Sequence, residues 1–220
     1  MIRAASAGAG GRPDYAGPVF TGLVQAVGRV AAIEPRATGA RLLIDPAGWG
    51  HRPAPGDSIS VSGACLTVAE GSTPSAWAFD VVHETLAKTA LGRLTPGGRV
   101  NLEHAVTAAT LMGGHFVQGH VDGVGTVERV QATADWRLTI RPPADLMPFM
   151  APKGSVCLDG VSLTIADLSP EAITIALIPT TLERTTLRDL KPGDGVNIEA
   201  DILAKTVVHY LRNFAGPRAG

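Results

Sequence analysis

Apolar and polar residues alternate along much of the chain, as they do in short strands with one buried face. AWAFDVV (76–82) and AITIALI (172–178) follow this alternation, and ISVSGACLTVA (59–69) has β-branched residues on both sides of a Gly turn. VQAVGRV (24–30) is a similar run interrupted by Gly. These segments predict strands joined by tight turns.

One short helix is predicted after each alternating segment. The two helices are TLAKTAL (85–91) and TLERTTL (181–187), with Thr85 and Thr181 as N-caps, because a threonine hydroxyl can accept a hydrogen bond from a free backbone N–H. Each helix leads to a Pro-Gly turn and then to a last strand, RVNLE or GVNIE.

A longer helix is predicted over DILAKTVVHYLRNF (201–214), with Asp201 as its N-cap. Apolar residues lie on one face of it, at positions Leu203, Val207, Tyr210, Leu211 and Phe214. Such a stripe has to be covered either by the rest of the chain or by another subunit. We expect an oligomerisation helix.

The chain repeats itself at an offset of about 97 residues. GACLTVAE (63–70) matches GVSLTIAD (160–167), and residues 84–103 match residues 180–199 with about half of the positions identical. This period is too long for a solenoid, so each copy must bury its own core. The chain therefore consists of two homologous halves.

About six strands per copy with closely spaced turns favour a small closed barrel, which leaves no exposed sheet edge. The sequence predicts an all-β fold: two tandem six-stranded antiparallel β-barrels with short helices, plus a C-terminal α-helix. We expect the first barrel over residues 19–114, the second over 115–200 and the helix over 201–214. Residues 1–18 are expected to be a disordered extension or a mis-set start, with translation beginning at Val19.

Composition and charge argue against several classes of protein. The net charge is −1 with no long run of one sign, so the basic field of a nucleic-acid binder is missing. Cys65 and Cys157 lie far apart without CxxC spacing, which fits a reducing cytoplasm better than a disulfide framework or a zinc site. We expect neither a membrane span nor a secretory signal, since the chain has no long apolar run.

Five segments carry a resemblance to a known family. They are FTGLVQAVGRV (20–30), SGACLTV (62–68), GGHFVQGHVDGVGTV (113–127), LDGVSLTI (158–165) and IPTTLERTTL (178–187). Together they resemble the alpha-type riboflavin synthases, whose two halves are each lumazine-binding barrels. The resemblance covers residues 19 to 214, and GGHFVQGHVDG is its most specific part.

The resemblance implies an enzyme that forms riboflavin in the last step of its biosynthesis. Two molecules of 6,7-dimethyl-8-ribityllumazine dismutate by transfer of a four-carbon unit, which gives riboflavin and 5-amino-6-ribitylamino-2,4-pyrimidinedione. It also implies a cytoplasmic homotrimer, with an active site between barrels of neighbouring subunits and a possible association with lumazine synthase. No metal or redox cofactor is expected.

Five residues are predicted to be catalytic. They are Cys65, His120, Lys153, Asp159 and Ser162. Cys65 matches the family's first-barrel motif and either lines the site, acts as a nucleophile or is a buried hydrophobe. His120 is the first choice for proton transfer, since histidine titrates near neutral pH, and His115 is a weaker candidate. Asp159 or Ser162 activates or supplies the nucleophile, and the residues leave the choice open.

The charges of the second copy distinguish it from the first. Lys153 and Asp159 align with Gly56 and Ser62, so these charged side chains occur in one copy only. A surface ion pair would explain them too, but it would contribute little to stability. The asymmetry favours a functional role.

Further residues of the motifs are expected to bind the substrate. They are Phe20, Thr21, Gly22, Thr67, Glu84, Thr85, Gly119, Val121, Gly160, Thr164, Ile178, Thr180 and Thr181. Ribityl hydroxyls need several donors and acceptors, which Thr and Glu side chains supply. For Thr67 and Thr164 a simple place in a barrel wall is the alternative.

Three other functions are alternatives to this enzyme. A non-enzymatic lumazine or flavin carrier would tend to lose the site of the second barrel, whereas KGSVCLDGVSLT (153–164) is intact here. A flavin-binding barrel of a reductase needs a nucleotide-binding domain after it. A purely structural module would not need GGHFVQGH (113–120).

Overall fold

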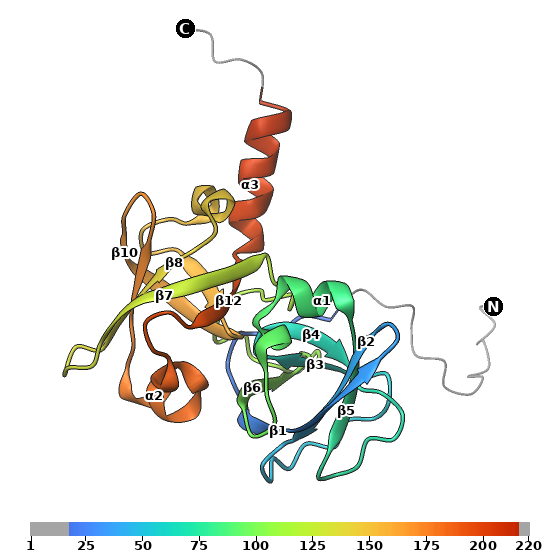
Figure 1. Cartoon of the computed structure of the whole chain (residues 1–220). Helices are drawn as coiled ribbons and strands as arrows, with labels where there is room; N and C mark the ends of the chain where they lie inside the picture. The colour runs from blue at the N-terminus through green and yellow to red at the C-terminus, as the bar shows by residue number, and fades with distance from the viewer. Residues whose placement is uncertain (1–17, 216–220) are drawn as a thin grey trace, which may run out of the picture.

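Two six-stranded units lie side by side, one coloured blue to green and the other yellow to red (Figure 1). The computed structural model describes residues 18–215, which form twelve strands, three α-helices and three 3₁₀ helices. We call strands β1–β6 the first repeat and strands β7–β12 the second repeat. The expected N-terminal extension lies outside the described residues, apart from residue 18.

The second repeat is a closed antiparallel barrel with the strand order β10-β11-β8-β7-β12-β9. Its strands are β7 (Gly123–Gln131), β8 (Arg137–Arg141), β9 (Ser155–Leu158), β10 (Val161–Leu168), β11 (Ile173–Ala176) and β12 (Gly195–Ala200). Leu138, Ile165 and Ile198 are among the fully buried side chains that fill it. The predicted six-stranded barrel is confirmed for this repeat.

The first repeat is a six-stranded sheet with the matching order β4-β3-β6-β1-β2-β5, but it is not closed. Its strands are β1 (Ala26–Arg36), β2 (Gly39–Asp45), β3 (Ser58–Val61), β4 (Ala64–Thr67), β5 (Trp77–Val82) and β6 (Arg99–His104). A single isolated bridge, between Val68 and Phe79, joins its two edges. The prediction of a closed barrel is therefore wrong for this repeat, whereas the number of strands is right.

The connection after the second hairpin strand explains the difference. In the second repeat β10 continues to Leu168 and pairs with both β9 and β11. In the first repeat β4 ends at Thr67, and after the Val68–Phe79 bridge the chain turns at Gly71, where φ is 85°. The ladder between β4 and β5 therefore ends after one bridge.

Each repeat has one short α-helix followed by a 3₁₀ turn. They are α1 (His83–Lys88) with η1 (Ala90–Arg93), and α2 (Pro179–Arg184) with η3 (Thr186–Asp189), while η2 (Ala144–Phe149) belongs to the second repeat alone. The predicted N-caps Thr85 and Thr181 are wrong, because both helices begin two residues earlier. Thr89 and Thr185 instead cap the 3₁₀ turns, each accepting a hydrogen bond from the N–H two residues later.

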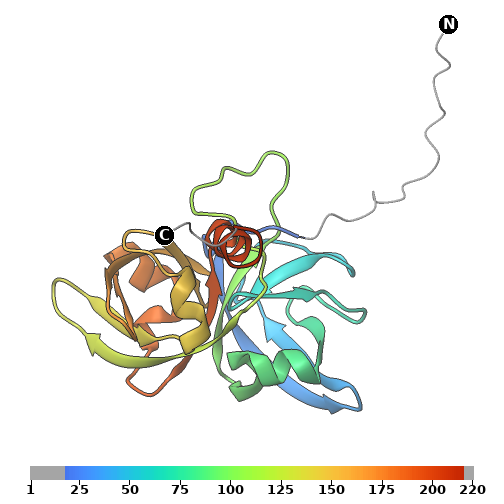
Figure 2. The same cartoon turned by 90° about the horizontal axis from the view of Figure 1, so that it is seen from above.

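Helix α3 (Ile202–Asn213) rises from the second repeat and is viewed end-on between the two units in Figure 2. Asp201 caps it as predicted, since its Oδ1 accepts a hydrogen bond from Leu203 N at 2.9 Å. The five predicted apolar positions are between 56% and 67% exposed, so the described part of the chain leaves them uncovered. No helix among the described residues is long and apolar enough to span a membrane.

Candidate functional site

Two hairpin tips meet where the repeats touch. Ser62-Gly63 joins β3 to β4 and Asp159-Gly160 joins β9 to β10, and all four residues have positive φ, between 44° and 82°. Paired positive φ values are typical of type I′ turns. A Cβ on Gly63 would lie 2.7 Å from Gly160 N, so a glycine is needed for the tips to approach.

Two asparagines bind these tips reciprocally. Asn101 on β6 donates from Nδ2 to Asp159 O at 2.8 Å, and Asn197 on β12 donates from Nδ2 to Ser62 O at 2.7 Å. Their Oδ1 atoms accept the N–H groups of η3 and η1 at 2.8 and 2.7 Å. Both side chains are 1% exposed, so these bonds hold the two repeats in one orientation.

The segments that precede the two repeats pair with each other and then cross to the opposite repeat. We call residues 20–24 the first crossing segment and residues 117–121 the second crossing segment. Phe20 forms a bridge with Val117, and both are fully buried. At their far ends, Val24 packs against the core of the second repeat and Val121 against that of the first. Each repeat is thus completed by the segment that leads into the other.

Cys65 lies beneath the second crossing segment. Its N–H donates to Gly119 O at 2.8 Å, and a Cβ on Gly119 would lie 2.6 Å from Cys65 Cβ. A cavity of about 260 Å³ opens beside it, lined by Ala64, Cys65, Glu84, Thr85, Lys88, Thr89, Gly119, His120 and Val121. Burial raises the pKa of the Cys65 thiol, which keeps it protonated at neutral pH.

Ser162 occupies the corresponding place under the first crossing segment. Its N–H donates to Gly22 O at 2.8 Å, and its Oγ lies 2.7 Å from His115 Nδ1. Burial lowers the pKa of the His115 imidazole, and its Nε2 is buried with no hydrogen-bond partner among the described residues. A cavity of about 630 Å³ runs along the same segment, with Leu23 and Val24 in its wall. A neutral imidazole is thus in contact with a serine hydroxyl.

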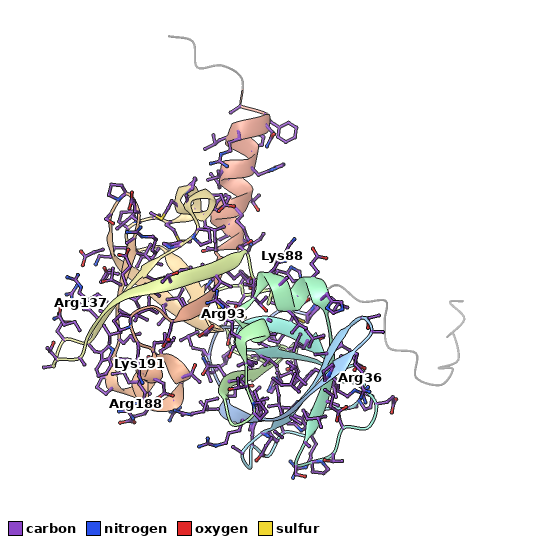
Figure 3. The ribbon with its side chains drawn as sticks, viewed as in Figure 1. Arg36, Lys88, Arg93, Arg137, Arg188 and Lys191 are labelled. Atoms are coloured by element: carbon purple, nitrogen blue, oxygen red, sulfur yellow. The ribbon has the colours of Figure 1, made fainter. Side chains whose placement is uncertain are left out.

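Asp159 faces a different space. Its Oδ1 accepts a hydrogen bond from Asn197 N at 2.8 Å, and burial raises its pKa to about 7. It lines a cavity of about 590 Å³ between the repeats, and Arg93, which also lines that cavity, lies between the two units in Figure 3. Its counterpart Ser62 lines the same cavity and accepts from Asn101 N at 3.2 Å.

The structure brings together several of the residues predicted from the sequence. Cys65, Glu84, Thr85, Gly119, His120 and Val121 line one cavity. Phe20, Thr21 and Gly22 belong to the segment that covers Ser162, and Gly160 forms the tip that touches Gly63. Their roles as catalytic or substrate-binding groups stay predictions.

Other predicted residues lie apart from these. Lys153 is exposed, with φ at 63°, and its N–H donates to Ile165 O at the end of the β9–β10 hairpin opposite Asp159. It takes the backbone position of Gly56, which also has positive φ. Five of the predicted substrate-binding residues are not buried: Thr67, Thr164, Ile178 and Thr180 are exposed, and Thr181 is half-buried. No group of three or more His, Cys, Asp and Glu side chains among residues 18–215 is placed to hold a metal ion.

Two buried carboxylates were not among the predicted site residues. Glu103 accepts hydrogen bonds from the first crossing segment and Glu199 from the second. The sequence carries a signal for them, since the otherwise apolar last strands have the same Asn and Glu in VNLE (100–103) and VNIE (196–199). Polar side chains at equivalent positions of two buried strands indicate specific partners.

Comparison with known proteins identifies the class to which this double-repeat fold belongs. The family model of the lumazine binding domain matches twice, over residues 21–105 and 118–201. Riboflavin synthase of Mycobacterium tuberculosis is 40% identical over 203 residues, which are 89% of this chain and 99% of that protein. Riboflavin synthase of Bacillus subtilis is 37% identical over 196 residues, 88% of this chain and 90% of that protein. The chain therefore belongs to the riboflavin synthase family, as the motifs predicted.

Solved structures show the same fold. A crystal structure of LumP complexed with 6,7-dimethyl-8-(1'-D-ribityl) lumazine superposes with a TM-score of 0.74 and 27% identity, covering 82% of this chain and 98% of that one. LumP complexed with riboflavin gives a TM-score of 0.75 and 29% identity over the same shares.

Proposed function

We propose that the chain catalyses the dismutation of two molecules of 6,7-dimethyl-8-ribityllumazine to riboflavin and 5-amino-6-ribitylamino-2,4-pyrimidinedione. Its membership of the riboflavin synthase family supports this reaction. LumP, with a similar fold, binds the same lumazine. Two ligands held in neighbouring sites would react without the entropic cost of a bimolecular encounter.

The observation that carries the proposal is the different chemistry at the two equivalent positions. In the first repeat the Cys65 thiol lies under the second crossing segment. In the second repeat the Ser162 hydroxyl lies beside His115. Two identical binding sites would suffice for a carrier. In a dismutation one molecule gives the four-carbon unit and the other accepts it. The donor and the acceptor therefore need sites with different chemical groups.

His115 is suited to activate Ser162. With its proton on Nε2, the neutral imidazole presents Nδ1 as an acceptor for the hydroxyl proton at 2.7 Å. As the Ser162 Oγ–H bond breaks, Oγ forms a bond to a ring carbon of the acceptor lumazine, and the proton passes to His115. The ring double bond at that carbon opens, and its electron pair moves onto the neighbouring ring atom. We favour Ser162 over Asp159 as the nucleophile, since the Ser162 hydroxyl contacts a histidine that can take its proton, whereas Asp159 Oδ1 is bonded to Asn197 N.

His120 lines the cavity beside Cys65 and is suited to proton transfer in the other site. Burial raises the pKa of Cys65, so we propose that the thiol lines this cavity rather than attacking the substrate.

We further propose that the active unit is a cytoplasmic homotrimer with sites shared between neighbouring subunits. The uncovered apolar face of α3 supports contacts between subunits, because a stripe of this kind is unfavourable in water. Light scattering should give three times the monomer mass, and Val207→Glu should reduce that mass. An association with lumazine synthase would be detected by co-sedimentation of the two purified proteins.

The decisive experiment mixes the purified protein with 6,7-dimethyl-8-ribityllumazine and no added cofactor. Riboflavin should accumulate to half of the lumazine consumed, followed by absorbance and fluorescence. Binding without turnover would overturn the enzymatic proposal and favour a carrier.

A further inference from the structure

Glu199, in the second repeat, holds the second crossing segment, which covers Cys65 in the first repeat. It lies on β12 of the second repeat and is 2% exposed, and its two carboxylate oxygens accept the N–H groups of Gln118 at 2.6 Å and His120 at 2.9 Å. Between these two anchored residues, Gly119 O accepts the N–H of Cys65 in the first repeat. A carboxylate of one repeat therefore fixes a wall of the cavity in the other.

Glu103 does the same in the opposite direction. It lies on β6 of the first repeat and is 3% exposed. One oxygen accepts from the backbone N and the hydroxyl of Thr21, both at 2.7 Å, and the other accepts from Gly22 N at 3.0 Å. Gly22 O in turn accepts the N–H of Ser162 in the second repeat.

Both oxygens of each glutamate accept N–H groups when the carboxylate is ionised, which for Glu199, whose pKa burial raises to about 7, is the state above that pH. Two backbone N–H groups point at the two oxygens, those of Thr21 and Gly22 at Glu103 and those of Gln118 and His120 at Glu199, so both oxygens must be acceptors. A glutamine has the same shape, but its side-chain NH₂ group would face one of the two backbone N–H groups, so two donors would meet. Burying a charge is costly unless it is bonded in this way, and an apolar residue would fill a barrel wall at less cost.

We infer that Glu103 and Glu199 are positioning residues for the two ligand sites: Glu103 clamps the segment that covers Ser162, and Glu199 clamps the segment that covers Cys65, in each case in the opposite repeat. The role of the two glutamates in ligand sites rests on the proposed function, but the clamp itself can be tested without substrate. Because of this clamp, the position of the segment that covers one site depends on a glutamate of the other repeat.

Alkylation of Cys65 by iodoacetamide, followed by mass spectrometry of the peptides, reports on the second crossing segment. Glu199→Gln should raise the Cys65 labelling rate about tenfold or more, because a lost charge-assisted hydrogen bond shifts the opening equilibrium by at least that factor. Glu103→Gln is the matched control and should leave this rate unchanged. Cys157, which is 1% exposed and packs with Phe20 and Val117 where the two crossing segments pair, reports on complete separation of the segments and should stay protected.

The reciprocal experiment uses a thiol introduced by Ser162→Cys. In that background Glu103→Gln should raise labelling at position 162, and Glu199→Gln should not. Equal labelling at 65 and 157, or a rise at Cys65 in both glutamine variants, would mean general loosening and would overturn the clamp. An unchanged Cys65 rate in a folded Glu199→Gln variant would overturn it as well.

Steady-state kinetics link the clamp to the sites and separate the two proposals. If riboflavin is formed, both variants should raise KM for the lumazine by about tenfold. This is the factor expected when the crossing segment that forms the wall of the site loses one charge-assisted hydrogen bond. Site-selective labelling in a protein that forms no riboflavin would refute the proposed function and leave the clamp standing. Riboflavin formation with unchanged labelling and KM would do the reverse.

Discussion

Gly22 and Ser162 are in direct contact across the boundary between the two repeats: Gly22 O accepts the Ser162 N–H at 2.8 Å, and a Cβ on Gly22 would lie 2.6 Å from that of Ser162. Gly22 also has φ at 73°. Gly119 and Cys65 have the same relationship in the other half. The approach of the crossing segments to Ser162 and Cys65 therefore depends on residues without a Cβ.

Gly22→Ala should consequently lower both stability and activity. Positive φ alone costs about 1–2 kcal/mol for alanine, and the contact with Ser162 adds displacement of the segment. Gly48→Ala is the matched control, because Gly48 has φ at 79° and nothing within 4 Å of the added Cβ. Urea unfolding and riboflavin formation would be compared. Equal effects of the two substitutions would show that the contact is unimportant.

Asn101→Ala should destabilise the whole chain rather than one repeat. The substitution leaves Asp159 O and Thr186 N without their partners in a buried place, at a cost of about 1–3 kcal/mol for each unsatisfied group. Asn213→Ala, in an exposed position on α3, serves as the control. Denaturant unfolding would be followed by Trp49 and Trp77 fluorescence for the first repeat and Trp136 fluorescence for the second. Transitions that separate, or a loss confined to one repeat, would contradict this expectation.

Asp159→Asn should flatten the pH dependence of stability. Burial raises the pKa of Asp159 to about 7, above the ~3.9 of a free Asp, so the folded state binds this proton more tightly than the unfolded state. Stability must then fall as the pH rises from about 4 to about 7, by at most ~1.4 kcal/mol per pH unit. Glu199, with its pKa raised to about 7 by burial, contributes with the same sign.

The asparagine at position 159 keeps an oxygen for the Asn197 N–H and removes one of these two titrations. We expect the variant to be more stable than the parent at pH 8 and less different at pH 5, measured by urea unfolding. Asp80→Asn is the control, because hydrogen bonding to Arg41 lowers the pKa of Asp80 and gives the opposite sign. A variant less stable than the parent at pH 8 would contradict the expectation. Full activity in the variant would argue against Asp159 as a catalytic residue.

The repeat made much of the fold predictable. Equivalent segments in the two halves defined the strands, the hairpin turns and the order of elements, and the capped C-terminal helix followed from its own pattern. That the sheet of the first repeat stays open was not predictable in this way. GACLTVAE (63–70) and GVSLTIAD (160–167) look alike, and only the connection after them decides whether the edge strands meet.

The candidate site was predictable as a set of residues but not as an arrangement. Motif residues such as Cys65 and Ser162 could be named, whereas the crossing of residues 20–24 and 117–121 depends on hydrogen bonds between residues about 80 positions apart. Short sequence patterns do not show contacts between residues so far apart in the chain. The identical Glu in VNLE and VNIE was the one local sign, because a charge in a buried strand needs a partner.

Ser162 and His115 should behave as a unit in catalysis. If His115 accepts the proton of Ser162 as the serine attacks, Ser162→Ala and His115→Phe should each lower kcat by about 10²-fold or more. The double variant should then lose little beyond either single one, since removing one partner already abolishes the function of the other. His83→Phe, on the exposed surface, is the control for loss of an imidazole. Single-turnover rates of riboflavin formation would be measured for all four proteins, and losses that multiply in the double variant would show that the two side chains act independently.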